Sequence, residues 1–230
     1  MTLRNVTVSG NSAPNSRGGG IHISASTVFD FVDLFNVTIS GNSAFRGGGL
    51  DLFGGGFFNL VNITVADNTA TLVSGIRGDT TVRVSYFNML ISNNDCGFIA
   101  GIPISNDHSM EGPTDTCFPP GAGDARAVAD LRLGPLADNG GPTMTHALLP
   151  GSPAIDAALD ADCPADDQRG FARPVDGDAD GVRRCDVGAF EAGAVDPLAI
   201  PALRPLGLLV LVVSIAVAAV AVLGRRTIAA

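Results

Sequence analysis

Residues 36–44 read Asn-Val-Thr-Ile-Ser-Gly-Asn-Ser-Ala, and residues 5–13 carry nearly the same string, Asn-Val-Thr-Val-Ser-Gly-Asn-Ser-Ala. Looser copies begin at Asn62 and Asn88, so the four copies start 31, 26 and 26 residues apart. Recurrence at a period of this length is the sequence signature of a repeat protein. We therefore expect one structural unit to be stacked several times along the N-terminal part of the chain.

Each copy contains the pattern of short β-strands joined by tight corners. Apolar Val37 and Ile39 alternate with polar residues, and a period of two indicates a strand with one buried face. A glycine-rich element, Arg-Gly-Gly-Gly, follows at residues 17–20 and again, in phase, at residues 46–49. Because one turn cannot bury its own apolar face, the turns must stack and form parallel sheets. The sequence predicts an all-β fold, a β-solenoid of about three to four turns over residues 1–95.

Stacking places equivalent residues of successive turns one strand spacing apart, roughly 4.8 Å. One asparagine of each copy then stands at the same corner, where stacked amides can hydrogen-bond to one another as a structural ladder. This predicted ladder consists of Asn11, Asn42, Asn68 and Asn94. A row of polar ligands is the alternative interpretation of the same four residues. A second column, a possible ligand site of ionisable side chains, consists of His22, Asp51 and Arg77.

The triads that begin at Asn5, Asn36 and Asn62 also fit the pattern for N-glycosylation. They recur in register with the repeat. Strand propensity and outward alternation are a sufficient cause for that recurrence, so we do not interpret the triads as glycosylation sites.

Residues 39–50, Ile-Ser-Gly-Asn-Ser-Ala-Phe-Arg-Gly-Gly-Gly-Leu, resemble the repeats of polymorphic outer-membrane proteins. The resemblance covers about residues 1–95. It implies a right-handed parallel β-helix and a bacterial surface protein of structural or adhesin-like, non-catalytic function, with a glycan or another cell-surface ligand. The alternative is a β-helix lyase or hydrolase of acidic glycans. No motif of a sugar-cleaving family and no Ser-His-Asp arrangement supports that alternative, so the chain is not expected to be an enzyme.

The repeat is lost after residue 95, and residues 96–129 are expected to be an irregular connecting loop. Four later strings share another resemblance: residues 133–143, 146–156, 167–170 and 185–191. They are very similar to the choice-of-anchor Q domain of bacterial surface β-helix proteins, over about residues 130–192. The resemblance implies surface display, an anchor further along the chain and no catalysis. We expect this segment to cover the open end of the last turn.

The four cysteines are Cys96, Cys117, Cys163 and Cys185. They form an even set with wide spacings and no CxxC pair, which favours the disulfides of an exported protein over a zinc site. Four separate buried thiols are the alternative. Of the three pairings that four cysteines allow, we prefer the sequential one.

A candidate metal site lies at residues 176–181, Asp-Gly-Asp-Ala-Asp-Gly. The alternation of Asp176, Asp178 and Asp180, with glycine in the sixth place, is typical of the opening of a calcium loop. The twelfth position is Val187, where such loops have glutamate. The sequence therefore predicts either a calcium site of a different geometry or an acidic, glycine-rich turn.

The charge excludes one class of partner and the N-terminus bears on export. The chain has a formal net charge of −9, from 14 basic and 23 acidic residues, so a nucleic-acid partner is disfavoured. No signal peptide is visible at the N-terminus, and the sequence starts inside a repeat. We interpret this as an N-terminally incomplete sequence.

An apolar run without a formal charge occupies residues 206–223, after a linker at residues 193–205. As a helix it would measure roughly 27 Å, enough to span a bilayer. Arg225 and Arg226 follow, so residues 224–230 are predicted to be cytoplasmic and the solenoid to lie outside. Residues 200–203, Ile-Pro-Ala-Leu, resemble the signature of bacterial IPTL-type sorting tails, which implies a membrane or cell-surface location and a sorting machinery as partner.

Overall fold

The computed structural model describes residues 1–79, 81–98, 102–117 and 123–195. Within these ranges the chain is all-β, with one 3-10 turn, η1 (Asp160–Asp162), and no α-helix. The predicted all-β class is therefore confirmed. The predicted membrane span at 206–223, the tail at 224–230 and most of the linker lie outside the described residues. None of the described residues belongs to a helix long and apolar enough to cross a membrane.

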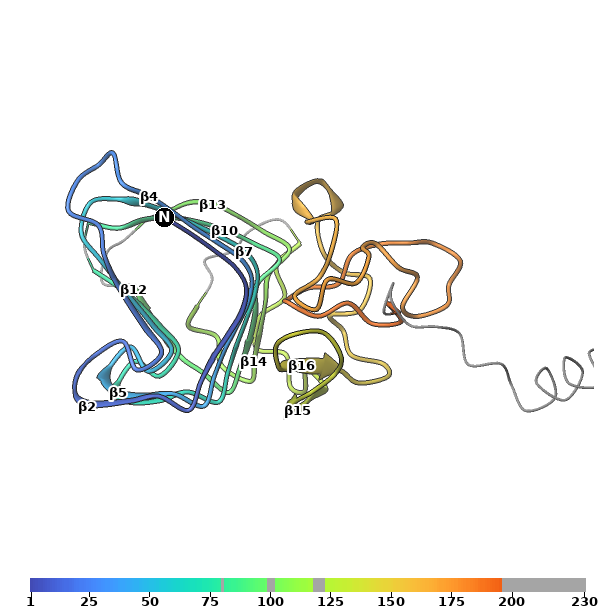
Figure 1. Cartoon of the computed structure of the whole chain (residues 1–230), viewed down its shortest axis with the longest axis horizontal. Helices are drawn as coiled ribbons and strands as arrows, with labels where there is room; N and C mark the ends of the chain where they lie inside the picture. The colour runs from blue at the N-terminus through green and yellow to red at the C-terminus, as the bar shows by residue number, and fades with distance from the viewer. Residues whose placement is uncertain (80, 99–101, 118–122, 196–230) are drawn as a thin grey trace, which may run out of the picture. The chain divides into compact units, whose positions relative to one another are not determined.

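The N-terminal part is a stack of parallel coils (Figure 1). The first coil contains β1 (Thr2–Ser9), β2 (Ser12–Arg17) and β3 (Ile21–Ser24). The second contains β4 (Phe31–Ser40), β5 (Ser43–Arg46) and β6 (Leu50–Phe53). The third contains β7 (Phe57–Ala66), β8 (Thr69–Leu72) and β9 (Ile76–Gly78). The fourth contains β10 (Arg83–Phe87), β11 (Leu90–Ser92) and β12 (Cys96–Phe98).

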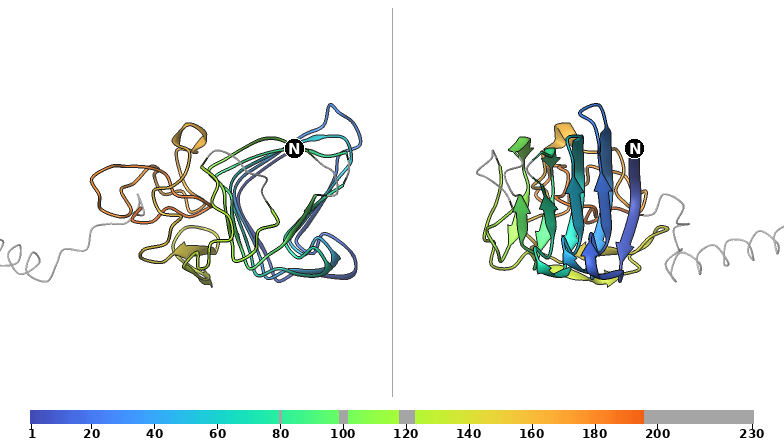
Figure 2. Two further views of the ribbon diagram at one scale, coloured as in Figure 1. Left: turned by 180° about the vertical axis from the view of Figure 1, so that it is seen from behind. Right: turned by 90° about the vertical axis from the view of Figure 1, so that its left-hand side faces the viewer.

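Equivalent strands of successive coils form parallel sheets, and Figure 2 shows them side by side. One sheet runs β1-β4-β7-β10-β13, a second runs β2-β5-β8, and a third runs β3-β6-β9-β12. Val37 pairs with Val6 and with Ile63, so the repeats stand in register. The apolar residues of the alternating pattern point inward, and Val37 and Ile63 are completely buried. This arrangement is a parallel β-solenoid.

The solenoid extends beyond the predicted boundary at residue 95. Strands β13 (Ile102–Asp107) and β14 (Met110–Gly112) begin a further coil on β10 and β11. The prediction of an irregular segment from residue 96 is therefore wrong up to Gly112. Backbone groups at the edge of a parallel sheet accept another strand whatever its side chains are, so the coils continue after the repeat signature is lost.

A second asparagine of each repeat makes a bend within the long strands. Asn36, Asn62 and Asn88 have φ angles of 52°, 53° and 55°, in the left-handed region that asparagine tolerates better than most residues. The bend divides β4 and β7 into two faces. All three side chains are completely buried, so the outward orientation expected for the triads at Asn36 and Asn62 is wrong, whereas Asn5 is half-buried. A glycan cannot be attached to Asn36 or Asn62 in the folded protein.

Residues 130–192, called the cap below, form an irregular unit with its own core. It contains the antiparallel pair β15 (Leu133–Ala137) and β16 (Thr145–Leu148). Its apolar core includes Ala154 and Val187, and continues into Leu90 of the solenoid. The cap lies along the side of the coils (Figure 1), on the face that follows the asparagine bend. The expectation that it covers the end of the last turn is therefore wrong.

The cap is attached to that face by hydrogen bonds to equivalent residues of successive coils. Gln168 bonds to Thr7 and Thr38, at 2.7 Å each, and the Ala189 N–H donates to the Thr64 hydroxyl at 2.9 Å. The Asn62 amide donates to the carbonyl of Gly188 at 3.0 Å. The residues that bend the strands thus also hold the cap. Docking along the side satisfies polar groups from several coils at once, which docking at one end cannot do.

Candidate functional site

The predicted column of ionisable residues is formed by β3, β6 and β9. His22 pairs in register with Asp51, and Asp51 with Arg77. The Asp51 carboxylate is completely buried and uses both oxygens: one lies 2.7 Å from His22 Nδ1, the other 2.7 Å from Arg77 Nη1. Arg77 is itself nearly buried, whereas 40% of the His22 side chain is exposed. Of the three side chains, His22 is therefore the one that is exposed at the surface. Its Nε2 does not contact Asp51 and faces outward.

His22 lines a surface hollow of about 350 Å³. The other lining residues come from β2 and β5: Asn15, Ser16, Arg17, Phe45 and Arg46. Ala13 and Arg17 pair with Ala44 and Arg46, so β2 has two more residues than β5 between these pairs. Extra residues bend a strand and redirect its side chains. The bulge in β2 therefore shapes this hollow, which we call the arginine hollow.

Arg17 and Arg46 pair in register on β2 and β5, and both line the arginine hollow. Arg17 lies over the ring of Phe53 at 5.1 Å and Arg46 over that of Phe45 at 5.5 Å. Among the described residues neither guanidinium makes an ion pair or a side-chain hydrogen bond, and the buried Nε of Arg46 has no partner. The hollow is therefore a basic site on an acidic protein.

One feature of the repeats indicates this pair of arginines. Arginine opens the glycine-rich element of the first two repeats, at Arg17 and Arg46, and Leu72 occupies the corresponding position of the third coil. Because three glycines follow it, the arginine looks like part of a turn. The arginine recurs in register, however, so two arginines lie next to each other on adjacent coils.

The predicted ladder of asparagines is formed and has a structural role. Asn42 donates its side-chain N–H to Asn68 Oδ1 at 2.9 Å, and Asn68 donates to Asn94 Oδ1 at 3.0 Å. Asn11 continues the ladder on the outer side, at 3.0 Å from Asn42 Oδ1. Asn42, Asn68 and Asn94 are nearly completely buried, so they offer no surface to a ligand.

The disulfides follow the sequential pairing. Cys96 is joined to Cys117, and Cys163 to Cys185. The first bond attaches the chain after β14 to β12, and the second closes a loop within the cap. No described cysteine is free, so a metal site built on thiolates is excluded for these residues.

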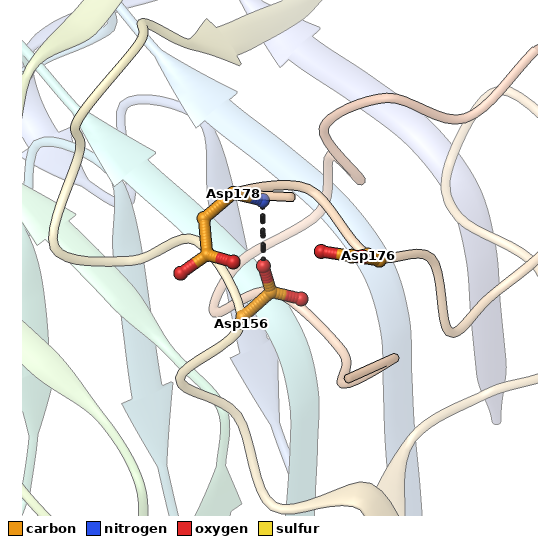
Figure 3. A group of neighbouring side chains, drawn as sticks. All are labelled: Asp156, Asp176 and Asp178. Atoms are coloured by element: carbon orange, nitrogen blue, oxygen red, sulfur yellow. Dashed lines mark hydrogen bonds between the residues drawn. The ribbon is translucent and has the colours of Figure 1, made fainter. Parts of the chain in front are cut away.

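Three acidic residues of the loop are predicted to bind calcium. The structure brings two of them together, and a residue outside the loop takes the place of the third. Asp176 and Asp178 lie with Asp156, and one oxygen of each lies within 4.8 Å of the others (Figure 3). Asp180 instead contacts Arg184 at 3.3 Å and accepts the Val182 N–H at 2.7 Å. Asp186 and Glu191 do not join this cluster and belong to a buried network of the cap.

That buried network holds the cap together. The Arg173 guanidinium lies 3.3 Å from the Glu191 carboxylate, and both side chains are completely buried. Arg169 and Asp167 form a second pair at 2.7 Å. Burial raises the pKa of Glu191 to about 7. Asp167, Arg169 and Glu191 come from the strings that suggested the anchor domain, and the arrangement of the network is that of a structural core.

His146 also has a structural role. Its Nδ1 lies 2.7 Å from the Gly134 carbonyl oxygen, and its Nε2 lies 2.8 Å from the Ser40 hydroxyl. His146 is buried and joins β16 of the cap to β4 of the solenoid. Both ring nitrogens are occupied, so this histidine is not a candidate for acid–base chemistry.

Comparisons with protein-family models, with curated proteins and with solved structures found no match. The resemblances of residues 39–50 and 130–192 therefore stay predictions. The function is inferred below from the geometry of the arginine hollow and of the cap.

Proposed function

We propose that this chain is a non-catalytic, cell-surface β-helix module that binds an acidic glycan in the arginine hollow. The observation that carries the proposal is the pair of arginines in register, Arg17 and Arg46, which line one hollow and have no acidic partner among the described residues. Two like charges in one hollow repel each other, and an anion bound there reduces that repulsion. Carboxylate and sulfate groups accept two parallel N–H bonds from one guanidinium.

The rest of the hollow suits a sugar ring. Phe45, which is partly exposed, provides apolar surface beside the cations, and Asn15 and Ser16 provide neutral hydrogen-bonding groups. A small inorganic anion needs none of these groups. An acidic sugar uses all of them, because it presents one charge, several hydroxyls and an apolar ring face.

The surface location is supported by the two disulfides, which are typical of exported proteins. We propose that the coils are right-handed, in keeping with the strong preference of parallel crossover connections, and that the protein is related to the polymorphic outer-membrane and choice-of-anchor Q families. In this proposal residues 206–223 attach it to the membrane or direct it to a sorting machinery. The solenoid and cap then lie outside the cytoplasm.

The test uses two double variants of equal charge change. Arg17→Gln/Arg46→Gln removes the pair in the hollow, whereas Arg4→Gln/Arg83→Gln removes two arginines that lie over Phe35 and Phe57 on another sheet. Calorimetric titration with oligogalacturonate and a heparin oligosaccharide should show binding that the first variant weakens by about 10- to 100-fold. The control should stay within about threefold, and neutral dextran should not bind. Equal losses in both variants would mean a diffuse charge effect and no site.

One observation favours the alternative function, a lyase of acidic glycans. Asp51 orients His22 so that Nε2 is presented beside Arg17 and Arg46, which is the arrangement of a positioned base next to groups that hold a carboxylate. Such a base takes the proton on the carbon next to the carboxylate, the glycosidic bond breaks at the following carbon, and water protonates the leaving oxygen. Asp33 and Arg83, two further ionisable residues of the coils, lie on a different sheet. Formation of an unsaturated uronate, lost in His22→Ala, would replace the non-catalytic proposal.

A further inference from the structure

The loop at residues 176–181 and the turn at Asp156 meet in the cap, some distance along the chain from each other but side by side in space (Figure 3). The Asp156 carboxylate accepts the N–H groups of Gly177 and Asp178 with Oδ2, at 3.0 and 2.9 Å. Asp176 and Asp178 contribute their carboxylates from the loop, so that oxygens of all three residues lie within 4.8 Å of one another.

The other oxygen of Asp156 points to an absent partner. Asp156 is only 8% exposed, and its Oδ1 is buried without a hydrogen bond. In Figure 3 this oxygen turns to the side on which Asp176 lies. A buried carboxylate oxygen left unpaired is costly, and two neighbouring carboxylates increase that cost. Within the described part of the chain, no arginine or histidine forms an ion pair with any of the three acids.

The loop itself is held in shape before any ligand arrives. Asp176 accepts the N–H groups of Asp180 and Gly181 at 3.1 and 2.9 Å, and Asp178 also accepts that of Asp180 at 2.9 Å. Gly181 has a φ of 90°, which allows the sharp turn. The side chain of Asp180 is directed to Arg184 and away from the cluster.

We propose that Asp156, Asp176 and Asp178 form a calcium site that fastens this loop to the turn at Asp156. Calcium takes six to eight oxygen ligands in an adaptable geometry, so three carboxylates with backbone carbonyls and water can serve it. Asp178 is exposed and leaves room for that water. Magnesium requires a strict octahedral geometry and loses its bound waters reluctantly, so it should bind this site more weakly than calcium.

The site would act on the stability of the whole cap. The Asp156 N–H donates to Asp186 at 2.7 Å, so the metal site is connected to the buried charge network. The Cys163–Cys185 bond joins the two chain segments on either side of the loop. Burial raises the pKa of Asp156, and the charge of Asp178 adds to that rise, which makes a proton the competitor of calcium for this carboxylate. The site is independent of glycan binding at the arginine hollow.

The experiment titrates calcium chloride into the chelator-treated full chain in detergent, by calorimetry, and measures the melting temperature in parallel. We expect one calcium ion for each chain and a rise in melting temperature of roughly 5–10 °C at a hundredfold excess over the Kd. Asp178→Asn keeps an acceptor for the Asp180 N–H but removes a charged ligand, and should weaken binding about tenfold or more. Magnesium should bind more weakly than calcium.

Asp180→Asn is the matched control, because it makes the same charge change in the same loop outside the cluster. It should bind calcium within about twofold of the unmodified chain. Equal losses in Asp178→Asn and Asp180→Asn would overturn the ligand set proposed here. A chain that gives no heat and no change in melting temperature at millimolar calcium would overturn the site, and would leave a proton on the buried Asp156 oxygen as the explanation.

Discussion

The solenoid and the cap bury polar groups in different ways. In the solenoid the buried asparagines of the ladder find their partners in their own counterparts of the next coil, as Asn42 does in Asn68 and Asn68 in Asn94. In the cap the buried groups are largely charged, and each has a different partner, as Arg173 has in Glu191. The ladder of the solenoid follows from the periodicity of the sequence alone. The buried ion pairs of the cap require that every member of one particular set of residues is present.

This difference has a consequence for how the two regions fail. A ladder loses a few neutral hydrogen bonds when one member is removed, whereas a buried ion pair that loses one charge leaves the other uncompensated. The cap is also attached to the solenoid by hydrogen bonds to single columns, such as Gln168 to Thr38 and Ala189 to Thr64. We therefore expect the cap to be the part that opens first.

The largest effect is expected from Arg173→Met. The change leaves the buried Glu191 without its cation, and such losses cost about 3–5 kcal/mol. Hydrogen exchange should accelerate by two orders of magnitude or more in β16 and at residues 185–192, while β4 and β7 stay protected. Arg183→Met is the control, because among the described residues the exposed Arg183 side chain bonds only to the Pro174 carbonyl, and it should change stability by less than about 0.5 kcal/mol. Equal acceleration in β4 and β7 would show that the two regions unfold as one.

A smaller effect is expected within the ladder. Asn68→Ala removes the acceptor of two Asn42 N–H groups and the donor to Ile39 and Asn94, in a position that is 2% exposed. Its cost should be about 3 kcal/mol in a chemical denaturation experiment. Asn11→Ala makes the same change at the exposed end of the ladder and should cost less than about 1 kcal/mol. If both variants lost the same amount, burial would not be the source of the ladder's contribution.

The two regions also differ in how many of their contacts can be predicted from the sequence. A period of 26 residues is sufficient by itself to place Asn42 beside Asn68, and Asp51 beside Arg77. No such rule connects Asp156 with Asp176, 20 residues later, because their contact depends on how an irregular chain turns. The side docking of the cap was equally hidden: Thr38 and Thr64 look like ordinary strand residues, and only the position of the cap gives them partners.

The smallest effect, and the one that separates the regions most cleanly, is that of pH. Burial raises the pKa of Glu191 to about 7 and that of Asp186 to about 6. Arg173, Arg169 and Asp167 are the other charges of this network. In the unfolded chain both carboxyls titrate near their ordinary values, about 4. The folded cap therefore holds these protons more tightly, and its stability is greatest below about pH 4 and declines as the pH rises through 6 and 7.

This decline should amount to about 1.4 kcal/mol for each pH unit and each of the two carboxyls, over the interval between the unfolded and folded pKa values. Hydrogen exchange of β16 and of residues 185–192, followed as a function of pH after correction for the intrinsic rate, measures it. Glu191→Gln should reduce the slope, because its amide does not titrate. Exchange in β4 and β7 should change little over the same range. A steeper slope in the solenoid than in the cap would contradict the assignment of the titration to the buried pair, because Glu191 and Asp186 both belong to the cap.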